Sequence, residues 1–114
     1  MATPHDLLHA ALAGGTSTPP TWGQLRALLH AVSSEPSPES VALLRKVAQH
    51  EGTLELSPAG GLPHAMAPEE MARFVAVQAL GEWDAESHRE VLVRAAQLSD
   101  SDHVIGAVRQ LTDG

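Results

Sequence analysis

Apolar residues recur at helical spacing along most of this 114-residue chain, and the stretch that begins at Pro68 is the clearest. Its apolar stripe follows i, i+3, i+4 spacing and consists of Ala72, Val75, Ala76, Ala79, Leu80 and Trp83. Phe74 and Val77 add apolar surface beside the stripe. A helix that is apolar on most sides must be covered on most sides, and alanines let neighbouring helices approach closely. We therefore expect a middle helix of a stack that ends at Leu80-Gly81, with Gly81 as the left-handed C-terminal residue.

Five further stretches show helical spacing and are separated by segments rich in Gly, Pro and Ser. We expect these helices at 4–13, 21–32, 38–51, 86–98 and from about 101 almost to the chain end. Thr21 stands three residues before Gln24 and predicts a capping box. Ser37 and Pro38 are typical of a helix start, and Gly52 is expected to end the third helix. Residues 53–67 lack helical periodicity and predict a long loop, with an extended piece at 53–56.

Two pairs of stretches resemble each other. The ten residues from Arg73, RFVAVQALGE, align with the ten from Val104, VIGAVRQLTD, at an offset of 31 residues. LLRKVAQ (43–49) aligns with VLVRAAQ (91–97) at an offset of 48. Either these segments are internal repeats, or they share only the spacing of any two amphipathic helices.

The pattern resembles the HEAT-like helical repeats, particularly the short bacterial form named after the phycobilisome lyases. The first helix of that family runs V-R-x-x-A-A-x-A-L-G and an acidic turn D-x-D-x-x-V follows the second. The positions that fit are Arg73, Ala76, Ala79, Leu80 and Gly81, then Asp100, Asp102 and Val104, the last one residue early. The resemblance is good over 68–113, weak over 21–52 and absent in the loop. Ile105 and Gly106 replace the usual Val-Arg pair of the last repeat.

This resemblance implies an all-α fold: a short stack of five to six helices, either open or closed into a compact bundle. The 114 residues favour one domain. It would comprise an N-terminal helix and linker (1–20), a helix pair (21–52), the loop (53–67) and a repeat and a half (68–113). Members of the family have many uses and share no catalytic residues, so the resemblance implies a scaffold rather than a reaction.

The charge and composition of the chain limit the classes of partner that it can bind. The net charge is -7 and the seven Lys and Arg residues are scattered, which disfavours nucleic acid and permits a basic protein. The absence of Cys excludes disulfides, thiolate ligands and a Cys nucleophile. The first residues do not read as a signal peptide and no apolar run has membrane-spanning length, so we expect a cytoplasmic protein without membrane contact.

No motif predicts catalysis, a cofactor or a metal. His5 and His9 are four residues apart and would share a helix face, but they lie in a terminal segment, and we interpret them as half-exposed polar residues. His88 and His103 are expected to be neutral surface groups. We interpret the paired acids near helix starts as capping residues. Two i, i+4 ion pairs are expected, Glu69–Arg73 and Glu90–Arg94.

The sequence therefore predicts a non-enzymatic protein-interaction module. By analogy with the repeats, the polar faces of the third and fifth helices would meet the partner through Arg45, Lys46, Gln49, Arg89, Arg94 and Gln97. The last helix lacks a following partner helix, and its apolar residues Val104, Ile105, Val108 and Leu111 are expected either to fold back into the domain or to support self-association. The alternative is a small acidic inhibitor or immunity-type protein that neutralises a basic partner.

Overall fold

The computed structural model describes residues 3–14, 19–52, 54–57 and 67–113. Over these ranges the chain forms α-helices and no strand, which confirms the all-α fold class. The six helices are α1 (Pro4–Ala13), α2 (Trp22–Ser33), α3 (Pro38–Ala48), α4 (Pro68–Asp84), α5 (Arg89–Leu98) and α6 (Asp102–Asp113).

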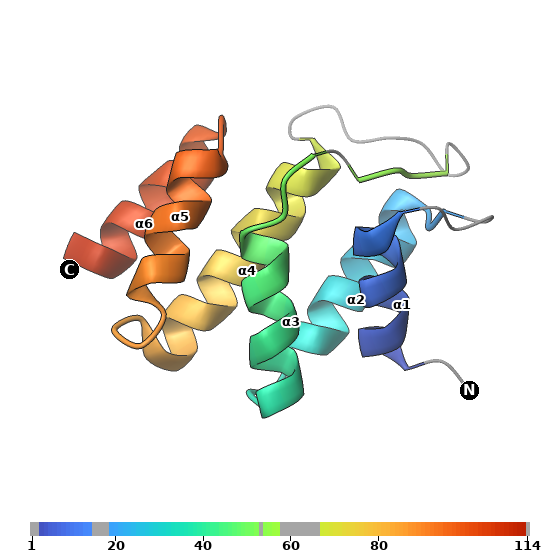
Figure 1. Ribbon diagram of the computed structural model, residues 1–114, viewed down its shortest axis with the longest axis horizontal. Coiled ribbons are helices and arrows are strands. Elements are labelled where there is room, and N and C mark those ends of the chain that lie inside the picture. Colours follow the sequence, from blue (N-terminus) through green and yellow to red (C-terminus); the bar gives the residue numbers. More distant parts are fainter. Residues whose placement is uncertain (1–2, 15–18, 53, 58–66, 114) are drawn as a thin grey trace.

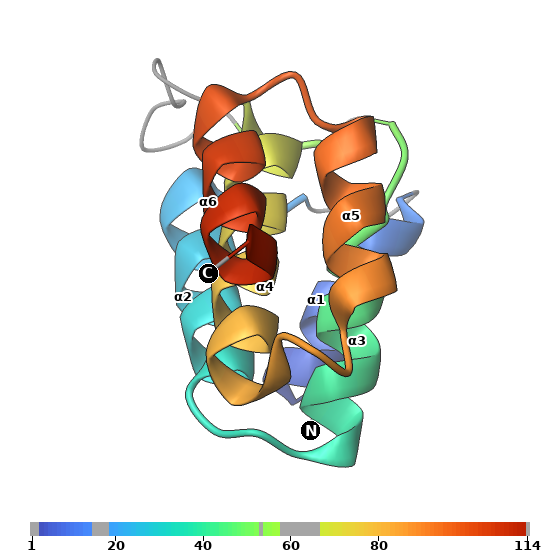
Figure 2. The same cartoon turned by 90° about the vertical axis from the view of Figure 1, so that its left-hand side faces the viewer.

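The helices form two layers that the chain visits alternately. Helices α1, α3 and α5 lie side by side in one layer, and α2, α4 and α6 form the other (Figures 1 and 2). Consecutive helices run in opposite directions, so all helices of one layer are parallel (Figure 1). The molecule measures 41 × 31 × 19 Å, and its longest axis follows the stack from α1 and α2 to α5 and α6. The arrangement is therefore a two-layer stack, and its 13.4 Å radius of gyration is that of a compact domain.

The core lies between the two layers, and α4 is at its centre. This helix packs against α2, α3, α5 and α6, as predicted for a middle helix. Ala72, Ala76 and Ala79 of α4 are buried, and their small side chains permit these close approaches. The largest fully buried side chains of the stack are Leu8, Leu25, Leu29, Leu43, Leu44, Leu80 and Leu92.

The similar sequence segments occupy neighbouring helices of the same layer. Ala76 and Val77 of α4 correspond to Ala107 and Val108 of α6, and all four are buried. Likewise, the buried Leu43, Leu44 and Val47 of α3 correspond to Val91, Leu92 and Ala95 of α5. Equivalent positions therefore have equivalent environments in successive helix pairs.

The predicted helix starts are confirmed where a side chain caps the backbone. Thr21 accepts a hydrogen bond from the Gln24 N–H (3.1 Å), and the Gln24 side chain accepts one from the Thr21 N–H (2.9 Å). Ser37 accepts a hydrogen bond from the Ser40 N–H (3.0 Å), and Pro38 occupies the first turn of α3. These caps use groups close in sequence, which is why the sequence alone predicts them.

Two predicted helix ends and one predicted helix start are wrong. α4 continues through Gly81 to Asp84, and Gly81 is helical rather than left-handed. α3 ends at Ala48, although Gly52 does have a positive φ of 95°. α5 begins at Arg89 instead of residue 86, because Asp84 accepts hydrogen bonds from Ser87 and holds 84–88 in a turn.

The segment after α3 is described only in part. Thr53 lies outside the described residues, and 54–57 form no strand. Leu54 is buried in the core, and the Ser57 N–H donates a hydrogen bond to the Pro20 carbonyl (2.9 Å). These contacts attach the start of the predicted loop to the helical stack.

Candidate functional site

The predicted partner-binding residues lie on two neighbouring parallel helices of one layer. All are exposed, on α3 and α5 or, for Gln49, directly after α3, and we call this region the α3–α5 surface: Arg45, Lys46, Gln49, Arg89, Arg94 and Gln97. Val93 of α5, 39% exposed, adds an apolar side chain to this surface. The structure thus brings together residues up to 52 positions apart, from Arg45 to Gln97.

This surface carries four of the seven basic residues of the chain. Arg94 of α5 contacts Glu51, just after α3, at 3.3 Å. Arg89 is the first residue of α5, and Arg45 and Lys46 lie in the last turn of the neighbouring parallel helix α3. These three cations form no ion pair with any residue that the structure describes. They are therefore free to meet an acidic group from outside.

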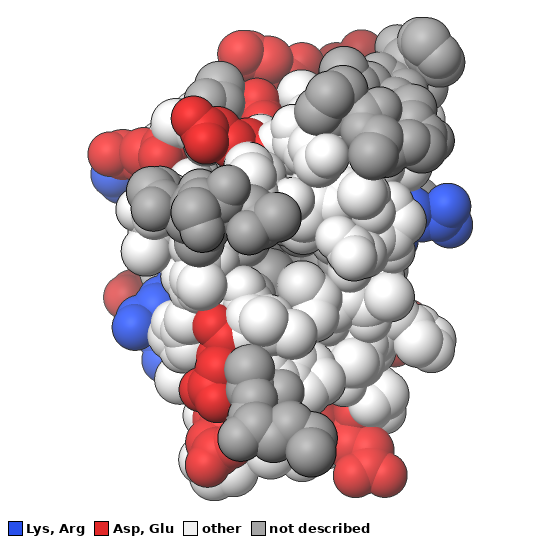
Figure 3. Space-filling model, turned by 90° about the vertical axis from the view of Figure 1, so that its right-hand side faces the viewer, with Lys and Arg blue, Asp and Glu red and all other residues white. Residues whose placement is uncertain are grey.

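A second candidate surface lies at the end of the stack and was not predicted from the sequence. We call it the α1–α2 end face, and in Figure 3 the described residues visible at its centre carry no charge, whereas acidic residues lie toward its edges. An apolar pocket of about 330 Å³ opens here between α1 and α2. Its lining residues are Leu7, Ala10, Ala11, Pro20, Gln24, Ala27 and Leu28.

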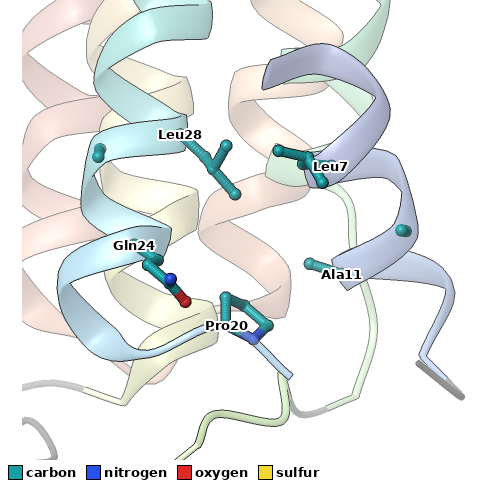
Figure 4. Close-up of a pocket in the computed structure, with 7 residues that line it drawn as sticks. Leu7, Ala11, Pro20, Gln24 and Leu28 are labelled. Atoms are coloured by element: carbon teal, nitrogen blue, oxygen red, sulfur yellow. The ribbon is translucent and has the colours of Figure 1, made fainter. Parts of the chain in front are cut away.

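The side chains of Leu7 and Leu28 point toward one another across this pocket (Figure 4). Leu7 is 47% exposed, the most exposed large apolar side chain that the structure describes. Gln24, the one polar side chain of the lining, accepts the hydrogen bond from the Thr21 N–H. The only signal in the sequence is the helical spacing of the apolar residues in each helix, which does not show which of them are covered. At the end of a stack one flank of each helix has no neighbour, so part of the stripe stays uncovered.

Arg73, which the resemblance singles out, is buried and belongs to a polar network instead of a binding surface. It is 3% exposed and pairs with Glu70, and its Nη2 donates to the His50 carbonyl at 2.8 Å. Glu70 also accepts a hydrogen bond from the Ser99 hydroxyl. The network therefore connects the end of α3, the start of α4 and the turn between α5 and α6.

Both predicted i, i+4 ion pairs are wrong. Arg73 pairs with Glu70 instead of Glu69, whose Oε2 accepts from the Leu54 N–H at 3.3 Å. Arg94 pairs with Glu51 instead of Glu90. Arg73 therefore uses the acid three residues before it instead of four, whereas for Arg94 a tertiary contact replaces the local partner.

The histidines differ from one another in burial and in the contacts that they make. His5 of α1 lies 2.8 Å from the buried Ser40 hydroxyl of α3 and joins two helices of one layer, whereas His9 is exposed. His103 is exposed as predicted, but His88 is 8% exposed and not a surface group. Among the described residues, no three His, Asp or Glu side chains gather as they would around a metal ion.

Among the acids that the structure describes, Asp84 is the one with a clearly shifted pKa. The Ser87 hydroxyl (2.7 Å) and the Ser87 N–H (3.1 Å) donate hydrogen bonds that lower the pKa of the Asp84 carboxyl, and the nearby charge of His88 adds to this. Asp84 is fully exposed. These bonds close the α4–α5 turn and serve as a local cap.

The apolar residues of α6 are directed mainly into the domain. Val104 and Val108 are buried against the core, and Ile105 and Leu111 are partly buried. Of the four residues predicted to support self-association, only Ile105 and Leu111 keep accessible surface. The last helix has folded back onto α4 and α5, which is one of the two expected arrangements.

No family model matches this chain, and neither a curated protein nor a solved structure matches it. In the described ranges, no helix has both the length and the apolar character to cross a membrane.

Proposed function

We propose that this protein is a non-enzymatic protein-interaction module of the HEAT-like repeat type, and that the α3–α5 surface receives its partner. The alternating two-layer arrangement and the equivalent buried positions of successive helix pairs support a repeat origin. Stacks of this kind bind partners across the side-by-side helices of one layer.

The observation that carries the proposal is the position of three unpaired cations. Arg45 and Lys46 lie in the last turn of α3, and Arg89 is the first residue of α5, the neighbouring helix of the same layer. In a chain of net charge -7, such cations would be expected to pair with nearby carboxylates, yet they pair with none in the part of the chain that the structure describes. Unpaired cations beside the exposed Val93 suit a protein segment that presents an acid next to an apolar side chain.

This surface favours an acidic partner segment over the basic partner that the net charge alone suggested. Electrostatic complementarity is local, because interactions between exposed charges fade beyond about 8–10 Å at physiological ionic strength. The charges exposed on the α3–α5 surface, rather than the net charge of the chain, therefore determine which partner segment is favoured there.

Site-specific photo-cross-linking in the source cell tests this function. A benzophenone side chain would replace Gln97 on the α3–α5 surface or, as a matched control, Gln110 on α6 in the opposite layer; both glutamines are exposed. We expect one protein to be cross-linked from position 97 and not from position 110. Equal cross-linking from both positions, or none from position 97, would contradict a partner on this surface.

A further inference from the structure

We propose that the pocket between α1 and α2 binds a small neutral molecule that has an apolar body and one hydrogen-bond acceptor. The volume of the pocket, about 330 Å³, lies at the lower end of the range for ligand sites in proteins. The pocket is separate from the α3–α5 surface, so the proposal is independent of the protein-interaction function. It rests on the shape of the pocket, on the contacts that hold its walls and on the hydrogen bonding of its one polar side chain.

The pocket is a hollow with walls on opposite sides. Leu7 of α1 and Leu28 of α2 point toward one another across it, and Pro20 lies between the two helices (Figure 4). A molecule placed inside would contact both walls at once, and sites for small ligands bury most of the ligand surface in this way. A flat protein surface resting on this end of the stack would instead contact only the rim. The shape therefore favours a small molecule over a macromolecule.

Contacts outside the pocket hold its walls in place. His5 of α1 lies 2.8 Å from the Ser40 hydroxyl of α3, and the buried Leu8 anchors α1 in the core. The Pro20 carbonyl accepts a hydrogen bond from the Ser57 N–H (2.9 Å), and the proline ring restricts the backbone at this position. The pocket is therefore pre-formed, so that binding does not require these elements to be ordered first.

Gln24, the one polar side chain of the lining, can offer a donor to a ligand. Its Oε1 already accepts the Thr21 N–H (2.9 Å), and its own backbone N–H donates to the Thr21 hydroxyl (3.1 Å). This capping box fixes the side chain, and its Nε2 donates no hydrogen bond to a residue that the structure describes. A ligand that carries an acceptor oxygen would therefore complete the hydrogen bonding of Gln24.

The lining also favours a ligand without charge. None of the lining residues is charged, so a cationic ligand would lose its hydration there without gaining a carboxylate partner. An anionic ligand would find no cation in the lining and would be repelled by the net charge of -7. Small ketones and esters with an apolar body meet these requirements.

An NMR titration with camphor, a compact neutral ketone, tests the site. We expect saturable shifts of the amide signals of Leu7 and Ala27, with no change at Val93 on the α3–α5 surface. Camphorsulfonate, which has the same apolar body and a negative charge, should give no saturable shifts. Camphor that causes no saturable shifts at the lining, or equal shifts at Val93, would overturn the proposal. Lining signals that shift with protein concentration in the absence of camphor would assign the pocket to a second copy of the chain and would also overturn it.

Three variants test which residues form the site. Ala27→Trp fills the pocket and should abolish the saturable shifts, whereas Ala31→Trp, one turn further along α2 and outside the lining, should leave them unchanged; both alanines are exposed. Gln24→Glu keeps an acceptor for the Thr21 N–H but removes the donors, and should raise the dissociation constant for camphor about threefold to tenfold. Equal binding by the two tryptophan variants, or unchanged affinity in Gln24→Glu, would overturn the proposal.

Discussion

Gly81 of α4 lies directly against Leu111 of α6. A Cβ atom built on Gly81 would lie 2.4 Å from Cδ1 and 2.9 Å from Cγ of Leu111, closer than carbon atoms can approach. The missing side chain therefore provides the space into which the last turn of α6 packs. Gly81 does not end its helix but allows two helices of one layer to meet.

A double-mutant cycle between these residues should show strong coupling. Gly in a helix interior costs about 0.5–1 kcal/mol relative to Ala, so Gly81→Ala should stabilise the protein by that amount in a Leu111→Ala background. In the wild-type background Leu111 must move, and the gain should be cancelled or reversed. Urea unfolding monitored by circular dichroism measures both changes. The same increment in the two backgrounds would contradict the contact.

The two ion pairs should differ widely in their contribution to stability. Arg73 is buried and holds both Glu70 and the His50 carbonyl, so Arg73→Ala leaves a carboxylate without its counter-charge. We expect a loss of roughly 3 kcal/mol or more in the free energy of unfolding. Arg94→Ala removes the exposed pair with Glu51 and should cost at most about 1 kcal/mol.

Chemical denaturation of both variants at low and high salt distinguishes the buried ion pair of Arg73 from the exposed ion pair of Arg94. The effect of Arg94→Ala should shrink further in high salt, because exposed charges are screened. The effect of Arg73→Ala should persist, since burial shields that pair from solvent ions. Equal losses in the two variants would mean that the buried network does not stabilise the fold.

The helices and their order could be predicted from the sequence because local chemistry determines them. Thr21 and Gln24 are three residues apart, and the stripe of α4 repeats at helical spacing, so both signals lie within a few residues. Gly81 shows where this reasoning fails. A glycine near the end of an apolar run indicates either a helix end or a close approach, and only the position of Leu111, thirty residues later, distinguishes them.

The two candidate surfaces differ in the same respect, since one could be predicted from the sequence and the other could not. The exposed residues of α3 and α5 followed from the helical periodicity of each segment, and the layer arrangement joined them. The pocket at the α1–α2 end face could not be predicted, because Leu7 and Leu28 have the same spacing as core residues. Which flank of a stripe remains uncovered depends on the place of its helix in the stack.

The pKa of Asp84 should depend on Ser87. The Ser87 hydroxyl is the largest cause of the lowered pKa, so Ser87→Ala should raise it toward the ordinary value of 3.8, while the retained backbone N–H keeps part of the effect. A carboxyl whose folded pKa is depressed adds stability above its unfolded pKa and loses it as the pH falls through the folded pKa. Carbon-13 NMR titration of the Asp84 carboxyl measures the shift. An unchanged titration curve in Ser87→Ala would contradict the assigned cause.

Substitutions at the N-terminal caps of α2 and α4 are expected to change the stability of the protein in opposite directions. Thr21 caps α2 with its side chain, so Thr21→Ala should lower the free energy of unfolding by about 1 kcal/mol. Ala67 occupies the corresponding position of α4 and makes no side-chain hydrogen bond, so Ala67→Ser should raise it by about 0.5–1 kcal/mol. Thr21→Ser, which keeps the hydroxyl, is the control and should change little. Because Glu70 already binds Arg73 and Ser99, a new hydroxyl at position 67 would bond to the backbone N–H of the first turn and leave the buried network intact. A destabilised Ala67→Ser variant would show that the network and the cap compete for the same turn.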